Sequence, residues 1–169
     1  MFSVGVSPGI TNLLAAHCVS RLPQVEHIDL FLTLGMGERH GKASNLWFLD
    51  NLHKDYSPIK GENITITPFA EVKELHFQGE FLRAYNFNFS DQTTLMTTLP
   101  ISTCRSWISL EPFIISRVIH LLTRLRITKV LTISWIKSGV LKLFGRSQMG
   151  PDRFQVVVVA YEPGSRAPN

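Results

Sequence analysis

Hydrophobic and polar residues alternate along several short segments of the chain, and this period of two predicts β-strands. In the clearest segment, 25–34, Ile28 and Leu30 share one face of the strand, while Asp29 and Thr33 lie on the other. Similar alternation predicts strands over 2–6, 63–67, 72–77, 81–89 and 101–110. The β-branched run over 154–161 predicts a buried strand.

Hydrophobic residues at helical spacing predict helices over 10–22, 42–52, 90–98, 111–125 and 128–144, although 129–135 also fits a strand. The expected helix starts carry suitable residues: Ser7 offers an N-cap hydroxyl, and Pro8 and Pro112 suit the first helical position. Ser90 can cap the next helix, with Asp91 placed favourably in its first turn.

The order of these elements points to an α+β fold. Several strands follow one another as hairpin-like runs, which favours a mixed, largely antiparallel sheet with helices on one face. A doubly wound sheet is disfavoured because it would place a helix after nearly every strand. We expect a single domain over 1–161 and a flexible tail over 162–169.

Composition excludes several classes of protein. The 169 residues are 44% hydrophobic and 18% charged, which is too apolar for a disordered chain. Cys18 and Cys104 are the only cysteines, so a disulfide-stapled secreted domain is excluded, and we expect a reducing, cytoplasmic location. No apolar run reaches the roughly 20 residues needed to span a bilayer.

Charge is distributed unevenly along the chain. Residues 1–104 carry 7 Lys and Arg against 10 Asp and Glu, whereas residues 105–169 carry 10 against 3. The basic residues are spaced singly among apolar ones, so we interpret them as the solvated sides of two helices and expect no nucleic-acid or membrane partner. An alternative hypothesis is a polyanion site over 117–146 for nucleic acid or anionic lipid.

The loop at 35–41 has three glycines between a predicted strand and a predicted helix. This context resembles a dinucleotide-binding turn, but the glycine spacing is one residue off and bulky polar residues fill the loop. We therefore interpret it as a sharp turn that presents Glu38, Arg39 and His40 as candidate binding residues. The six histidines form no metal-ligand spacing, so no metal site is expected.

Two further segments carry candidate chemistry. The turn that contains Ser7, Gly9 and Asn12 directs a helix N-terminus, which attracts a carboxylate or a phosphate; an ordinary helix cap is the alternative. Over 85–92, aromatic and amide residues alternate before a helix start. The amide row predicts a polar-ligand or subunit contact, with a solvent-facing strand as the alternative.

The segment 5–15, Gly-Val-Ser-Pro-Gly-Ile-Thr-Asn-Leu-Leu-Ala, resembles the part of saccharopine dehydrogenase-like proteins where the chain leaves the dinucleotide-binding domain. The resemblance extends to 41–50 and to the Phe-Ser-Asp-Gln stretch within 85–92, and it covers most of the chain. In fold, it points to the C-terminal domain of saccharopine dehydrogenase-like and dihydrodipicolinate reductase-like oxidoreductases.

This resemblance implies an NAD(P)-dependent oxidoreductase of two domains, in which an α+β domain supplies the substrate cleft and the dimer contact. The cofactor carries the hydride and the protein orients it. By resemblance, the residues near the cofactor are Ser7, Pro8 and Gly9. The substrate residues so implied are Ser7, Gly9, Asn12, Glu38, Arg39, His40, Asn88, Asp91 and Gln92. No general acid or base is assigned.

The chain departs from the family pattern because no strand–GxGxxG–helix unit precedes Ser7. We therefore expect NAD(P) to be held by a domain outside this chain. We expect a small-molecule substrate and a homodimer formed through the sheet. The alternative hypothesis is a non-enzymatic oligomerisation module derived from a degenerate relative.

Overall fold

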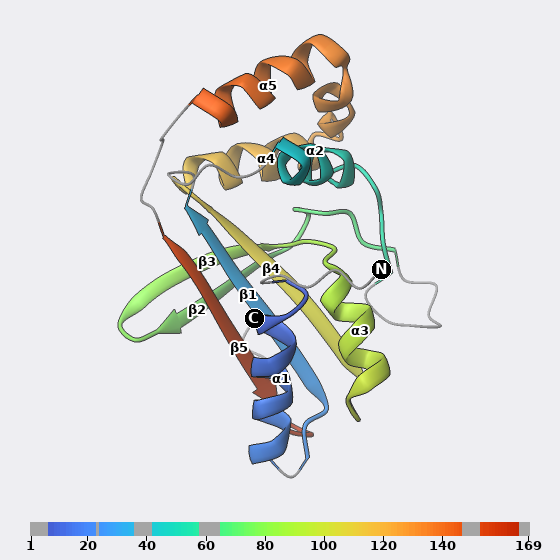
Figure 1. The fold of residues 1–169 in the computed structure, drawn as a ribbon, viewed down its shortest axis with the longest axis vertical. Helices are drawn as coiled ribbons and strands as arrows, with labels where there is room; N and C mark the ends of the chain where they lie inside the picture. The colour runs from blue at the N-terminus through green and yellow to red at the C-terminus, as the bar shows by residue number, and fades with distance from the viewer. Residues whose placement is uncertain (1–6, 23, 36–41, 58–64, 147–152, 166–169) are drawn as a thin grey trace.

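The computed structural model describes residues 7–22, 24–35, 42–57, 65–146 and 153–165 (Figure 1). Its helices are α1 (Ile10–Arg21), α2 (Lys42–Asn51), α3 (Ser90–Thr98), α4 (Ile114–Arg124), the 3-10 helix η1 (Thr128–Thr132) and α5 (Ser134–Arg146). Its strands are β1 (His27–Gly35), β2 (Val72–Phe77), β3 (Glu80–Asn86), β4 (Thr103–Glu111) and β5 (Phe154–Tyr161).

The strands form one five-stranded sheet in the order β2-β3-β4-β1-β5. β1 and β4 are parallel, and the other neighbours are antiparallel, so the predicted α+β fold with a mixed, mostly antiparallel sheet is confirmed. The sheet curls into a half-barrel, a feature that the alternation pattern did not predict. Gln78 and Gly79 both have positive φ in the tight turn that joins β2 to β3, as the predicted turn at Gly79 requires.

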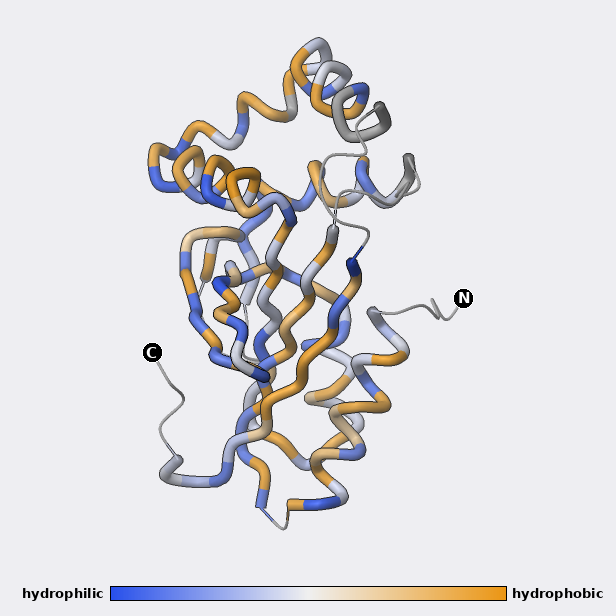
Figure 2. The backbone as a smooth tube through the Cα atoms, turned by 90° about the vertical axis from the view of Figure 1, so that its left-hand side faces the viewer, coloured by the Kyte–Doolittle hydropathy of each residue, from blue (hydrophilic) through white to orange (hydrophobic). Residues whose placement is uncertain are grey.

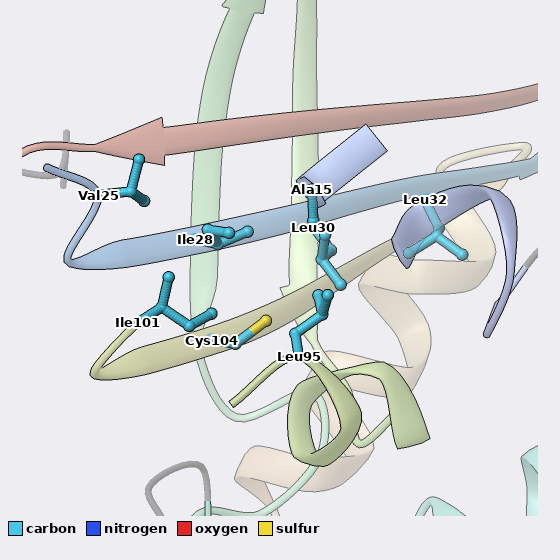
Figure 3. Packing of buried hydrophobic residues seen from close by; sticks show 8 residues of the cluster. All are labelled: Ala15, Val25, Ile28, Leu30, Leu32, Leu95, Ile101 and Cys104. Carbon is cyan, nitrogen blue, oxygen red and sulfur yellow. The ribbon is translucent and has the colours of Figure 1, made fainter. Parts of the chain in front are cut away.

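One face of the sheet packs against helices. Ile28 lies opposite Cys104 in the register, so both side chains belong to this face. Ala15 of α1 and Leu95 of α3 close over them and are 0% and 1% exposed (Figure 3). A second cluster on the same face includes Ile119 of α4 and joins α2 and α4 to the ends of β3 and β4. The apolar positions of strands and helices thus build two clusters on this face, and the partly buried Phe89 packs against both.

The opposite, concave face is filled by strands. Its cluster is Phe31, Leu82, Ala84, Trp107 and Val157, and within the described residues no helix contributes to it. The rings of Phe31 and Trp107 stack with centroids 6.3 Å apart. The β2–β3 hairpin lies on the side of the sheet opposite α1, so the curl itself covers this face (Figure 2).

Both predicted proline starts are wrong. The Ser7–Pro8 and Glu111–Pro112 peptide bonds are cis, and α1 and α4 begin two residues after these prolines. The residue that precedes α1 is Gly9, whose φ of 150° is a conformation that only glycine adopts without strain. The chain therefore enters α1 through a glycine turn, and the Ser7 hydroxyl is left to bond elsewhere.

Two strand predictions also need correction. Among the described strands β5 pairs only with β1, which makes it an edge strand of this sheet, and only Val157 and Tyr161 along it are buried. The strand expected over 63–67 is reduced, in its described part, to a single bridge between Tyr56 and Ile66. The strand expected over 2–6 lies outside the described residues. Over the described ranges, none of the helices combines the length and apolar character needed to cross a bilayer.

Candidate functional site

Asp91 links the first turns of two helices that are far apart in the sequence. Its carboxylate accepts a hydrogen bond from Ser7 Oγ, just before α1, and another from Thr11 Oγ1, 3.0 Å away in the first turn of α1. Asp91 itself lies in the first turn of α3. The positive ends of both helix dipoles therefore meet at one carboxylate, which favours a negative charge there.

The Asp91 side chain is fully buried, and its environment alters its affinity for protons. Burial raises the pKa of this carboxyl above its usual range, and the hydrogen bonds from Ser7 and Thr11 only partly oppose that effect. A carboxyl of this kind binds and releases a proton at a higher pH than a solvated one. Because it has no exposed surface, Asp91 positions the two hydroxyls rather than contacting a ligand directly.

The neighbouring candidate residues have different roles. The Gly9 carbonyl accepts the N–H of Leu13 at 3.1 Å, which starts the α1 ladder. The Gln92 side-chain amide donates to the Phe87 carbonyl at 2.8 Å and is buried, so its contact is structural. Asn12 Oδ1 is buried and has no hydrogen-bond partner within the described residues, whereas Asn88 is exposed.

The structure therefore brings together part of the predicted site. Ser7, with Pro8 and Gly9 directly after it, contacts Asp91 across 84 positions of sequence. Asn88 lies three residues before Asp91 and is open to solvent. Glu38, Arg39 and His40 lie outside the described residues.

Asn86 belongs to the predicted amide row and, in register with Trp107, lies on the sheet face opposite Tyr85 as expected, but its side chain is open neither to solvent nor to a ligand. Its amide donates to the Thr67 carbonyl at 2.8 Å and to the Tyr56 hydroxyl at 3.2 Å, and its oxygen accepts the Glu71 N–H at 2.7 Å. The side chain is 1% exposed. Because all of its contacts are within the fold, Asn86 anchors the irregular segment before β2 rather than a ligand.

A second polar cluster lies on the concave face, around Asp29 of β1. The Asp29 carboxylate is 0% exposed and pairs with His27 Nε2 at 3.0 Å and with Lys73 Nζ of β2. It also accepts a hydrogen bond from Trp107 Nε1 at 2.7 Å. The Lys73 ammonium lies over the rings of Trp107 and Tyr161, 5.5 and 5.2 Å from their centroids. The cluster thus ties β1, β2, β4 and β5 together on the concave face of the half-barrel.

The surroundings of Asp29 determine its charge. Burial acts to raise the pKa of this carboxyl, but the hydrogen bond and charge of His27, together with Lys73 and Trp107, outweigh burial and hold the pKa below its usual range. The pKa of Tyr161 is also raised, mainly by burial and to a smaller extent by Asp29. Burial, with the charges of Asp29 and Asp91, also raises the pKa of the Cys104 thiol to about 12, so this thiol is unreactive at neutral pH.

The Asp29 cluster was not identified as a site from the sequence, although a signal was present. Asp29 is a charged residue in a strand whose other members are mostly apolar, and His27 precedes it by two positions, on the same face. A buried charge needs a partner. Another partner, Lys73, is 44 residues away, and the curl of the sheet brings it close.

Within the described ranges, no group of three or more His, Cys, Asp or Glu side chains is placed to hold a metal ion. A scan against protein-family models finds no match for this chain, and a search of curated proteins finds no relative.

Proposed function

We propose that this chain is the substrate-binding and dimerisation domain of a saccharopine dehydrogenase-like, NAD(P)-dependent oxidoreductase. The observation that supports the proposal most is the contact of Ser7 and Thr11 with Asp91. The two segments that most strongly carry the family resemblance, 5–15 and 85–92, meet at this contact although 80 residues separate Thr11 from Asp91.

In this proposal, the junction of α1 and α3 forms one wall of the substrate cleft. Asp91 fixes the hydroxyls at the start of α1, and the half-buried Ser7 and exposed Asn88 are the groups that a polar substrate reaches. The cofactor supplies hydride transfer, while this domain binds and orients the substrate. Burial raises the pKa of this carboxyl, and a proton bound at Asp91 would change its hydrogen bonds with Ser7 and Thr11.

The same junction determines which part of a dinucleotide it could contact. A pyrophosphate favours a free helix N-terminus, but the Asp91 carboxylate already lies at the start of α1. Ser7, Pro8 and Gly9 therefore fit the uncharged carboxamide end of a nicotinamide better than a phosphate. The phosphate-binding residues belong, in this proposal, to a separate dinucleotide-binding domain.

The dimer contact is proposed at the β5 edge of the sheet. The curl already covers the concave face around Phe31 and Trp107, which are 0% and 3% exposed. β5 pairs only with β1 among the described strands, so one side of its backbone is open to pairing. An eight-residue, β-branched edge is a template for a second strand, and a second copy of β5 can pair with it across a two-fold axis.

Three observations test the proposal. Light scattering after gel filtration should give the mass of a dimer, and fluorescence titration with NADPH should show no micromolar binding by this chain. The genomic reading frame should encode a strand–GxGxxG–helix unit next to this domain. A monomer that binds NADPH tightly by itself, or a locus without any dinucleotide-binding fold, would overturn the proposal.

A further inference from the structure

A hollow of about 260 Å³ opens on the concave side of the half-barrel, away from the junction at Asp91. It lies where the β2–β3 turn, the end of β4 and the start of β5 come together. Its walls are Phe77, Glu80, Phe81, Leu82, Glu111, Phe113, Arg153, Gln155 and Val157. The volume suits a small ligand of about ten non-hydrogen atoms, below the range for drug-sized molecules.

The charges in this hollow do not cancel. Glu80 and Arg153 form an ion pair at the rim, and Arg153 also donates to Gln155 Oε1 at 3.1 Å. Glu111, the last residue of β4, is only 7% exposed. Its carboxylate makes no hydrogen bond or ion pair within the described ranges, although its charge reaches Arg153. Glu111 therefore presents to the hollow a negative charge that no described side chain pairs directly, and a cation that enters the hollow can pair with it.

Two buried hydroxyls next to the hollow also lack partners. Thr33 of β1 lies in register with Ser109 of β4 on one side and with Gln155 of β5 on the other, so all three share the concave face. Thr33 and Ser109 are 1% and 0% exposed, and neither hydroxyl has a hydrogen-bond partner within the described part of the chain. Unsatisfied buried hydroxyls mark a place where a water or a ligand group completes the hydrogen bonding.

The rim of the hollow is aromatic. Phe77, Phe81 and Phe113 line it and are 36%, 49% and 44% exposed, which is high for phenylalanine. The faces of aromatic rings attract organic cations and also accept apolar groups. A metal ion is disfavoured, since it would require several oxygen ligands around it.

From these features we propose that the hollow binds a small organic ammonium ion. The ammonium group pairs with the Glu111 carboxylate, and its apolar body packs between Leu82, Val157 and the phenylalanine rim. This site is on the sheet face opposite Asp91 and does not depend on the proposed oxidoreductase function.

Calorimetric titration with three matched probes tests the charge preference: 2-phenylethylammonium, the neutral 2-phenylethanol and the anionic phenylacetate. We expect the ammonium to bind at least tenfold more tightly than the alcohol, and phenylacetate not to bind. In amide NMR spectra, the ammonium should shift the signals of Thr33, Ser109 and Gln155. Equal affinity for ammonium and alcohol, or no saturation by the ammonium at millimolar concentration, overturns the proposal.

A pair of glutamate variants tests the assignment of the counter-charge. Glu111→Gln keeps the shape and should lower ammonium affinity at least tenfold while leaving alcohol affinity unchanged. The matched control is Glu162→Gln, which removes an exposed acid beyond the other end of β5 and should change neither. If Glu111→Gln does not fold, Phe81→Leu removes one ring from the rim and should reduce the ammonium-to-alcohol preference. Unchanged preference in the variant that folds contradicts the proposal.

Discussion

Two carboxylates, Asp29 and Asp91, are fully buried on opposite faces of the sheet, and their environments shift their pKa values in opposite directions. Asp29 has a lysine, a histidine and an indole N–H around it, so its charged form is favoured. Asp91 has two neutral hydroxyls, which do not offset burial. The identity of the donors, more than the depth of burial, decides the charge of each group.

Asp29→Asn should destabilise the protein by about 3–5 kcal/mol at neutral pH because it leaves the Lys73 ammonium buried without a counter-charge. The double variant Asp29→Asn, Lys73→Met should lose less than the sum of the two single losses. Urea unfolding of the four proteins gives the coupling energy. A coupling energy near zero would show that the pair is not the stabilising contact.

Ser7→Ala should raise the pKa of Asp91 further, because it removes one of two hydrogen bonds that favour the carboxylate. Carbon NMR of the Asp91 carboxyl, followed through a pH titration, measures the shift directly. Ser20→Ala serves as the control, since its hydroxyl donates to the His17 carbonyl on the far part of α1, away from Asp91. An unchanged titration in Ser7→Ala would mean that this hydroxyl does not bond to Asp91 in solution.

At the scale of elements, the backbone of β5 presents alternate residues to β1 and to the free edge. The Tyr161 carbonyl accepts the Glu26 N–H, and the Arg153 carbonyl accepts the Gly35 N–H, so odd-numbered residues bond to β1. In an antiparallel pair, the N–H and C=O of one residue point the same way. Even-numbered residues of β5 therefore point their backbone groups outward.

Val156→Pro should abolish the proposed dimer and retain the fold, because it removes an outward N–H and no bond to β1. Val157→Pro is the matched variant one position along: it removes an inward N–H and should destabilise by about 3 kcal/mol or more. Light scattering gives the mass, and thermal unfolding gives the stability. A Val156→Pro dimer would place the contact elsewhere than this edge.

The helix α4 carries apolar residues on both of its sides. Ile119 faces the core at 6% exposure, whereas Ile114, Val118 and Leu121 are 61%, 49% and 57% exposed, and Leu125, directly after the helix, is 58% exposed. The layer of helices at this end shows long hydrophobic stretches in Figure 2. The sequence pattern led us to expect a basic, solvated outer side, and Arg117 and Arg124 are indeed exposed there, but the outer side is also apolar.

Leu121→Gln should leave the stability within about 0.5 kcal/mol of the wild type and raise the solubility limit, because the side chain buries little area. Ile119→Ala, two positions earlier on the inner side, should cost about 2–5 kcal/mol through the cavity it leaves in the core. Urea unfolding and precipitation assays separate the two effects. A large loss of stability in Leu121→Gln would show that the outer side is covered in solution.

The elements that could be predicted from the sequence are those whose pattern is local. The alternation in β1 and the spacing in α2, α3 and α4 are properties of adjacent residues, and the structure confirms these elements. The helix starts at Pro8 and Pro112 were wrong, since α1 and α4 begin at Ile10 and Ile114. The edge position of β5 was missed because β-branched residues suit two kinds of strand. One kind is covered on its faces, here by α1 and by the curl, but has an open edge; the other is fully buried.

At the scale of the whole molecule, the decisive feature is the curl that carries β2 over the concave face. It brings Lys73 to Asp29 and forms the hollow at Glu111. The residues involved lie far apart in the sequence, so no local pattern predicts either feature. The Ser7 and Asp91 segments, in contrast, were selected separately as candidates, and the fold joins them. Sequence reasoning therefore identified the polar groups of the junction between α1 and α3 but not those inside the half-barrel.

The opposite pKa shifts of Asp29 and Asp91 predict mirror-image dependences of stability on pH. A lowered folded-state pKa means that Asp29 contributes stability above its unfolded pKa of about 4, which is lost as the pH falls. A raised folded-state pKa means that the contribution of Asp91 is complete below about pH 4 and is lost as the pH rises through the folded value. Asparagine mimics the neutral acid in both places.

The free energy of unfolding of Asp29→Asn should therefore approach that of the wild type at pH 3 and fall furthest below it at pH 8. For Asp91→Asn, the free energy of unfolding relative to the wild type should be highest at pH 8. Urea unfolding at intervals between pH 3 and 8 measures both profiles. Asp50→Asn, which breaks a partly exposed pair with Lys137, is the control and should give a flatter profile because solvent screens the pair. Profiles with the same sign of slope for Asp29→Asn and Asp91→Asn would mean that the two faces of the sheet do not hold their carboxylates in opposite charge states.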